Sequence, residues 1–147
     1  GAGAFESLRL EKGYRSLGTD IHTNTNPYES GLGFTVKLKK DADFIGKEAL
    51  SKIKEAPIQK KLACMVMDDS EGMALGTEPI YSDGKAVGYV TSTNYGYFVD
   101  KHIVYGYLPS ELSSTGTKLE LEYFGKRYPL TVTNEPLLDP ENTRLKS

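Results

Sequence analysis

The chain has 147 residues, enough for one hydrophobic core and too few for two domains of ordinary size. Its 18 basic and 20 acidic residues give a net charge of −2 and are spread along the sequence, which argues against nucleic acid or an anionic membrane as a partner. No apolar run reaches the roughly 18 residues of a membrane-spanning helix, so none is predicted.

A helix ends close to the start of the chain. Phe5, Leu8 and Leu10 are apolar among charged neighbours, and Gly13 follows at a position where helices typically stop. This pattern predicts a cropped C-terminal piece of a longer protein. A helix over 5–12 also needs a partner for its apolar side, which makes a free-standing β-barrel binder the least favoured interpretation.

A Gly-rich connection leads to the next predicted elements. The alternation in Phe34–Lys39 predicts a half-buried strand. Asp41 and Asp43 precede a short helix predicted at about 46–55, which Pro57 closes. Its apolar positions are spaced for one face: Ile45, Ala49, Leu50 and Ile53.

The remaining sequence is typical of short strands. The predicted strands are 62–67, 79–81, 86–90, 103–108, 118–124 and 127–133. Asp83-Gly84 and Gly125-Lys126 are predicted hairpin turns, and the polar segment Thr91–Gly96 is predicted to be a loop. Six strands with Gly-centred turns favour an antiparallel barrel or sandwich, separated near Ala56-Pro57 from what precedes it.

The sequence does not predict a metal site, a nucleotide site or a reactive cysteine. Cys64 lies in an apolar run and is interpreted as a small buried hydrophobic residue, because neither His22 nor His102 is near it in the sequence to act as a base. No His, Cys, Asp or Glu cluster has metal-ligand spacing, and no glycine-rich nucleotide-binding motif occurs.

Several spaced motifs share one order along the chain. They are Leu8-Arg-Leu-Glu-Lys-Gly-Tyr-Arg15, Gly18-x-Asp20, Thr25-x-Pro27-x-Glu29-x-Gly31-Leu32, Asp43-Phe-Ile-Gly-Lys-Glu-Ala-Leu50, Gly84-x-x-x-Gly88-x-x-Thr91-Ser92, Tyr105-Gly-Tyr-Leu108 and Pro136-x-x-Asp139-Pro140-x-x-x-Arg144. The chain thereby resembles the folate-binding aminomethyltransferase family, which includes the glycine cleavage T-protein. The first motif is more similar to the dimethylglycine and sarcosine dehydrogenase or oxidase branch.

The resemblance implies a mainly β fold with short helices (α+β). Residues 1–56 would be the tail of a folate-binding α+β domain, and residues 57–147 a C-terminal antiparallel six-stranded β-barrel. The implied cofactor is tetrahydrofolate, with FAD only in a missing upstream domain. The implied partners are folate and the upstream catalytic domain of the same chain. The implied location is the cytoplasm in a prokaryote or the mitochondrial matrix in a eukaryote.

Glu11 is the first folate-binding residue that the resemblance implies. A pterin ring presents adjacent N–H donors, and a carboxylate accepts both in a forked contact. The alternative is a solvated helix-end residue paired with Arg9 or Arg15.

Further folate contacts are weaker expectations. Arg144 and Lys40, together with Lys39, could bind the glutamate carboxylates of folate, and the alternative is that they are solvated surface charges. Four tyrosines offer stacking faces, although each fits a structural role as well: Tyr14, Tyr28, Tyr95 and Tyr97.

The chain is predicted to be part of an enzyme that transfers a one-carbon unit. The resemblance implies transfer from an aminomethyl or N-methyl amine donor to tetrahydrofolate. It places the family's catalytic aspartate upstream of this chain, so no catalytic residue is expected here and the piece alone is predicted to be inactive. The alternative is a non-catalytic regulatory or interaction module of the same fold.

Overall fold

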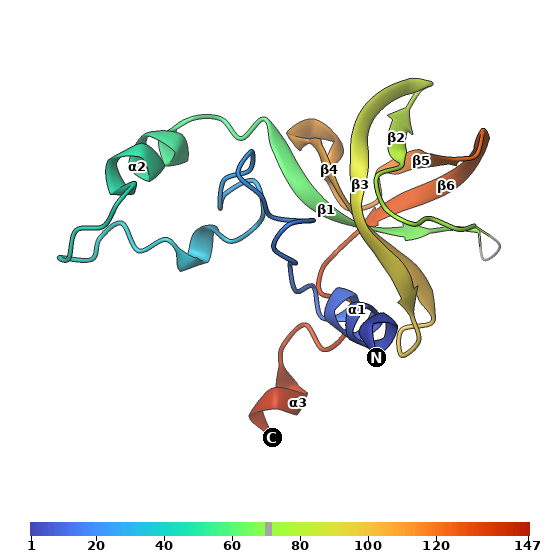
Figure 1. Cartoon of the computed structure of the whole chain (residues 1–147), viewed down its shortest axis with the longest axis horizontal. Coiled ribbons are helices and arrows are strands. Elements are labelled where there is room, and N and C mark those ends of the chain that lie inside the picture. Colours follow the sequence, from blue (N-terminus) through green and yellow to red (C-terminus); the bar gives the residue numbers. More distant parts are fainter. Residues whose placement is uncertain (70–71) are drawn as a thin grey trace.

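A computed structural model describes residues 1–69 and 72–147, which form mainly β-strands with a few short helices. Six strands form a closed antiparallel barrel in the order β1-β4-β3-β2-β5-β6 (Figure 1). The strands are β1 (Lys60–Met67), β2 (Pro79–Ser82), β3 (Lys85–Gly96), β4 (Lys101–Pro109), β5 (Lys118–Tyr123) and β6 (Lys126–Thr133). The helices are α1 (Ala2–Glu11), α2 (Lys47–Glu55) and α3 (Thr143–Lys146), with 3₁₀ turns at Gly33–Thr35 and Ser110–Leu112. The predicted six-stranded barrel is confirmed. None of the described helices has the length and apolar character needed to cross a membrane.

Two tight turns connect neighbouring strands of the barrel. Asp83 and Gly84 have φ values of +48° and +77°, the left-handed conformation that two-residue hairpins require at both positions. Phe124 and Gly125, with +48° and +75°, form the same kind of turn between β5 and β6. This second turn lies one residue before the predicted Gly125-Lys126 position, so Lys126 belongs to β6.

Side chains that alternate along the strands fill the barrel. Because successive residues of a strand point to opposite faces, β1 contributes Met65 and Met67 to the interior while Leu62 and Cys64 face outward. The interior cluster consists of Ala63, Met65, Met67, Ala74, Ile80, Val90, Val104, Leu108, Leu119, Leu121, Tyr128, Leu130 and Val132. Burial on both faces explains why the sequence of β1 is a continuous apolar run.

Two glycines allow β3 and β4 to approach closely. A β-carbon at position 88 would lie 2.1 Å from the backbone oxygen of Tyr107, and one at position 106 would lie 2.6 Å from that of Tyr89. Both distances are far below van der Waals contact, so Gly88 and Gly106 are required by the packing of this strand pair.

A second apolar cluster lies on the outside of the barrel, beneath α1. Leu10 of α1 is fully buried there against Leu62, Cys64, Ile103, Tyr105 and Tyr107 of β1 and β4. The predicted burial of Cys64 is confirmed, and that burial raises the pKa of its thiol to about 12. This cluster fixes α1 to the barrel wall.

The strand predicted at Phe34–Lys39 is wrong. The segment begins in the 3₁₀ turn Gly33–Thr35 and ends in a turn closed by the Lys40 N–H, which donates to the Lys37 oxygen at 3.1 Å. The six barrel strands hydrogen-bond one another in a closed ring, so no strand edge is open to pair with this segment.

The loop predicted at Thr91–Gly96 is also wrong, because this segment continues β3 beyond a register shift between Val90 and Ser92. Its polar side chains therefore belong to a barrel strand and not to a loop. The Ser92 hydroxyl, for example, donates to Asp20 at 2.7 Å.

Helix α2 stands away from the barrel at the end of two connecting segments (Figure 1). Its predicted bounds are confirmed to within one residue, but none of its residues is buried and Ile53 is exposed. The preceding Ile45 is exposed as well, so the predicted apolar face is uncovered in this chain. The Tyr28 hydroxyl attaches the helix by donating to the Leu50 oxygen at 3.3 Å. The division of the chain at residues 56 and 57 stays a prediction.

Candidate functional site

Helix α1 buries Ser7, Arg9, Leu10 and Glu11 against the barrel and leaves other apolar residues exposed to solvent. It ends at Glu11, and Gly13 follows with a φ of +72°, as the sequence predicts. Ser7 is buried and donates to the Tyr95 oxygen at 2.7 Å, whereas Phe5 and Leu8 are 66% and 62% exposed. The helix therefore carries an uncovered apolar face directed away from the barrel.

Glu11 is buried at the junction of α1 and the turn between β3 and β4. Its Oε1 accepts the backbone N–H groups of Phe98 at 2.6 Å and Val99 at 3.2 Å. No donor among the described residues reaches Oε2. Glu11 also lines a cavity of about 560 Å³ together with Asn94, Tyr97 and Phe98. One carboxylate oxygen thus holds the turn, and the other accepts no hydrogen bond from a described residue.

A buried ion pair that the sequence did not single out anchors the same helix. Arg9 Nη1 lies 2.7 Å from Oδ2 of Asp20, and both side chains are almost fully buried. Asp20 also accepts the hydroxyls of Thr91 at 2.6 Å and Ser92 at 2.7 Å, and the N–H of Ser16 at 2.9 Å. The sequence motifs given above contain Arg9, Asp20, Thr91 and Ser92, but nothing in their spacing indicated that these four side chains meet.

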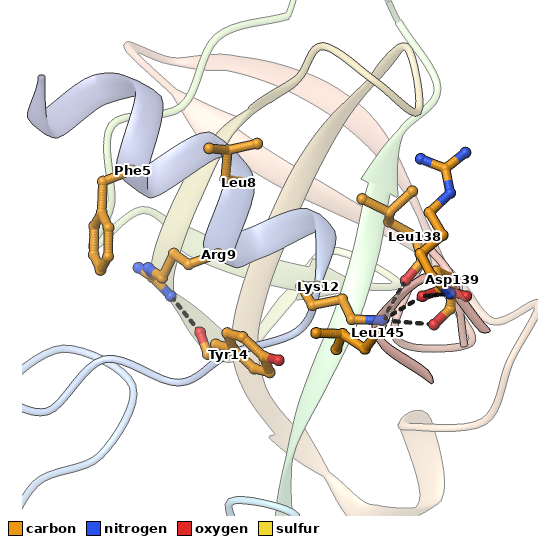
Figure 2. A pocket seen from close by; sticks show the side chains of 9 residues that line it. Phe5, Leu8, Arg9, Lys12, Tyr14, Leu138, Asp139 and Leu145 are labelled. Carbon is orange, nitrogen blue, oxygen red and sulfur yellow. Dashed lines mark hydrogen bonds and ion pairs between the residues drawn. The ribbon is translucent and has the colours of Figure 1, made fainter. Parts of the chain in front are cut away.

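A second cavity, of about 400 Å³, lies on the solvent side of α1 (Figure 2). Figure 2 shows Phe5 and Leu8 on one side of it and Leu138 and Leu145 on the other. Lys12 joins the two sides, because its Nζ donates to the backbone oxygen of Asp139 at 2.6 Å. The C-terminal segment thereby completes an apolar hollow beside the helix.

The predicted folate residues fall into two groups. Arg144 lines the second cavity, and its guanidinium lies 4.5 Å from the ring centre of Phe98, whose N–H binds Glu11. Phe98 therefore connects Glu11 and Arg144. Tyr28 instead donates its hydroxyl to the Leu50 oxygen of α2, and Lys40 lines a cavity shared with Lys39 that includes neither Glu11 nor Arg144.

The remaining tyrosines also differ in position. Tyr97 is 79% exposed beside Glu11 and packs edge-on against Tyr95, with ring centres 5.1 Å apart. Tyr14 lines the cavity in Figure 2. Within residues 1–69 and 72–147, no group of three or more His, Cys, Asp or Glu side chains is arranged to hold a metal ion.

The fold and this site define a barrel domain with helix α1 docked on its wall and a buried carboxylate, that of Glu11, beside a cavity lined by Tyr97 and Phe98. Residues 60–139 match the glycine cleavage T-protein C-terminal barrel domain, and residues 1–40 match the GCVT N-terminal domain. The chain therefore belongs to the glycine cleavage T-protein family.

Relatives of known function are much longer than this chain. Dimethylglycine dehydrogenase of Rattus norvegicus, a mitochondrial protein, is 40% identical over 99% of this chain and 17% of its own length. Mitochondrial sarcosine dehydrogenase of Homo sapiens is 36% identical over 97% of this chain and 16% of its own length. Aminomethyltransferase of Prochlorococcus marinus is 38% identical over 92% of this chain and 36% of its own length. The crystal structure of glycine cleavage system aminomethyltransferase T from Bartonella henselae superposes with a TM-score of 0.83, at 27% identity, over 93% of this chain and 38% of that one. This chain thus spans a sixth to just over a third of these relatives.

Proposed function

We propose that this chain is the C-terminal part of a tetrahydrofolate-dependent enzyme of the aminomethyltransferase type. The enzyme would transfer a one-carbon unit from an aminomethyl or N-methyl amine donor to tetrahydrofolate, releasing the amine and 5,10-methylenetetrahydrofolate. The observation that carries the proposal is the match of more than nine-tenths of the chain to aminomethyltransferases and to dimethylglycine and sarcosine dehydrogenases. The location would be the cytoplasm in a bacterium or the mitochondrial matrix in a eukaryote.

In this proposal the chain binds folate and leaves proton transfer to an upstream aspartate. The open Oε2 of Glu11 would accept a pterin N–H, and Tyr97 would offer an aromatic face. Arg144 has no acidic partner among the described residues, so its guanidinium would be available for a folate carboxylate. Lys40 and Tyr28 lie apart from these groups and carry less of the proposal.

An upstream domain of the same enzyme would cover the exposed face of α1. Phe5 and Leu8 leave an apolar surface beside the cavity in Figure 2, and such surfaces commonly mark contacts with another domain. In the dehydrogenase branch, a flavin domain carrying FAD would also precede this part. It would oxidise the N-methyl amine before folate captures the product.

A non-catalytic interaction module of the same fold is the alternative. One observation favours it: Oε1 of Glu11 already accepts two backbone N–H groups. Glu11 therefore has a structural task in the absence of any ligand, and a forked contact through both oxygens would compete with it.

Calorimetric titration of the chain with tetrahydrofolate separates the two functions. The test variant is Glu11→Gln, whose amide oxygen can still accept the N–H groups of Phe98 and Val99 but whose amide nitrogen cannot accept a pterin N–H. We expect the unsubstituted chain to bind tetrahydrofolate with micromolar affinity. The affinity of the variant should be at least tenfold weaker, because one charge-assisted hydrogen bond is lost. Glu55→Gln, on the exposed end of α2, is the charge-matched control. Equal binding by both variants would contradict the role of Glu11, and no binding by the unsubstituted chain would favour the interaction module.

A further inference from the structure

Four lysines surround a cavity on the segment that carries α2. Lys37, Lys39 and Lys40 lie on the turn that follows the first 3₁₀ turn, and Lys54 lies near the end of α2. They line a cavity of about 460 Å³. Its complete lining is Val36, Lys37, Leu38, Lys39, Lys40 and Lys54. We refer to it as the lysine cavity.

The ammonium groups of the lysine cavity have no acidic partners. None of the four forms an ion pair or donates a hydrogen bond to another described residue. Glu48, the acidic residue in the first turn of α2, pairs instead with Lys52 at 2.7 Å. Asp41, Asp43 and Glu55 are close in sequence, yet none of them lines the cavity. The charged residues of the lining are therefore all positive, with Val36 and Leu38 between them.

Hydrogen bonds build the wall of the lysine cavity from two segments. Lys47 Nζ donates to the Lys40 oxygen at 2.9 Å, which ties the start of α2 to the lysine-bearing turn. The Tyr28 hydroxyl holds the middle of α2 through the Leu50 oxygen. Lys37 and Lys40 also line an adjoining cavity of about 370 Å³. The lysine cavity is thus formed by two segments that hydrogen bonds connect, and a further cavity adjoins it.

The charge distribution indicates what this hollow can take. The whole chain carries a net charge of −2, so this concentration of positive charge runs against its overall balance. A cleft lined by one sign of charge focuses the field and raises the local concentration of counter-ions. Ammonium groups bind carboxylates and phosphates as point charges, without demanding a planar fork. We infer that the lysine cavity binds small anions that carry several closely spaced carboxylate or phosphate groups.

This inference overlaps with the proposed function at Lys39 and Lys40, but it goes beyond it because it requires neither a pterin ring nor Glu11 and includes Lys37 and Lys54. Two probes represent the two sources of such anions: tri-γ-glutamate for a carboxylate chain, and tripolyphosphate for phosphate. Calorimetric titration of the 147-residue chain at low ionic strength should give binding with at least one probe, and added salt should weaken it. Binding of only the carboxylate chain or only the phosphate identifies the source, and either result supports the inference.

A charge-matched pair of double variants tests the location. Lys37→Gln with Lys54→Gln removes two lysines of the cavity, whereas Lys85→Gln with Lys101→Gln removes two exposed lysines of the barrel. We expect the first pair to weaken binding about tenfold and the second to leave it unchanged. Circular dichroism checks that both remain folded. Equal weakening by the two pairs, or no binding of either probe at millimolar concentration, would overturn the inference.

Discussion

Single buried residues with ionisable side chains determine how α1 sits on the barrel. The pair Arg9–Asp20 is shielded from water, and Asp20 satisfies both carboxylate oxygens with four donors. A buried ion pair contributes little net stability, but the loss of one partner leaves an uncompensated charge. The pair therefore specifies the position of α1 more than it strengthens the fold.

Cys64 makes the stability of the chain sensitive to alkaline pH. Burial raises the pKa of its thiol from 9.0 to about 12, and burial also raises the pKa of the neighbouring Tyr105 hydroxyl. The unfolded state loses these protons first, so the stability that is present below pH 9 falls as the pH rises toward 12. Urea unfolding at several pH values should show this decline, at up to about 1.4 kcal/mol per pH unit for each group.

Cys64→Ala provides the control for this prediction. The variant removes the thiol but keeps Tyr105, so the decline above pH 9 should become shallower without disappearing. In the native protein the thiol should also resist alkylation at pH 8, because little thiolate forms there. Rapid alkylation of the folded chain, or an unchanged slope in the variant, would contradict the assigned burial.

The sequence predicted a residue of the site where a motif identified it, and it did not predict the contacts between residues that are far apart in the chain. Glu11 was identified by its motif and is positioned beside an aromatic cavity, although its role toward folate stays a prediction. The Arg9–Asp20 pair was not predicted, because ion pairs depend on how the chain returns to α1 after Gly13. The hydrogen bonds that Glu11 accepts from Phe98 and Val99 could not be predicted either, because these residues lie 87 and 88 positions away in the sequence.

At the scale of elements, α1 has one buried and one exposed apolar side. Leu10→Ala should lower the free energy of unfolding by about 2–5 kcal/mol, because Leu10 is fully buried beneath the helix. Leu8→Ala, two positions earlier and 62% exposed, should change it by less than about 0.5 kcal/mol. Chemical denaturation of the two variants measures both values. Similar costs would mean that α1 docks through a different face.

Strands were predicted well where turns marked their ends. The Asp83-Gly84 pair predicted a tight hairpin turn, in which both residues adopt the left-handed conformation, and the position of this turn indicated where β2 ends and β3 begins. Alternation alone misled at Phe34–Lys39, because a strand also requires a partner edge. Polarity alone misled at Thr91–Gly96, because the polar side chains of a strand can bind other parts of the protein, as Thr91 and Ser92 do when they donate to Asp20.

At the scale of the whole molecule, the barrel and the segment around α2 differ in protection. Residues 37–54 carry six exposed or half-exposed lysines on a segment without buried residues, whereas the barrel lysines lie in hydrogen-bonded strands. Brief digestion with trypsin should therefore cut first between 37 and 54 and leave residues 60–133 intact. Mass spectrometry of the early fragments identifies the sites. First cuts after Lys118 or Lys126 would contradict this difference in stability.

The closure of the barrel has a consequence for protein synthesis. β1 completes the ring by pairing with β6, and Glu11 accepts a backbone hydrogen bond from Leu138 at 3.0 Å. The ribosome makes α1 and β1 before β6 and Leu138, so both must wait for partners translated near the end of this stretch. The nascent chain therefore exposes one edge of β1 and one end of α1 until β6 and Leu138 have emerged.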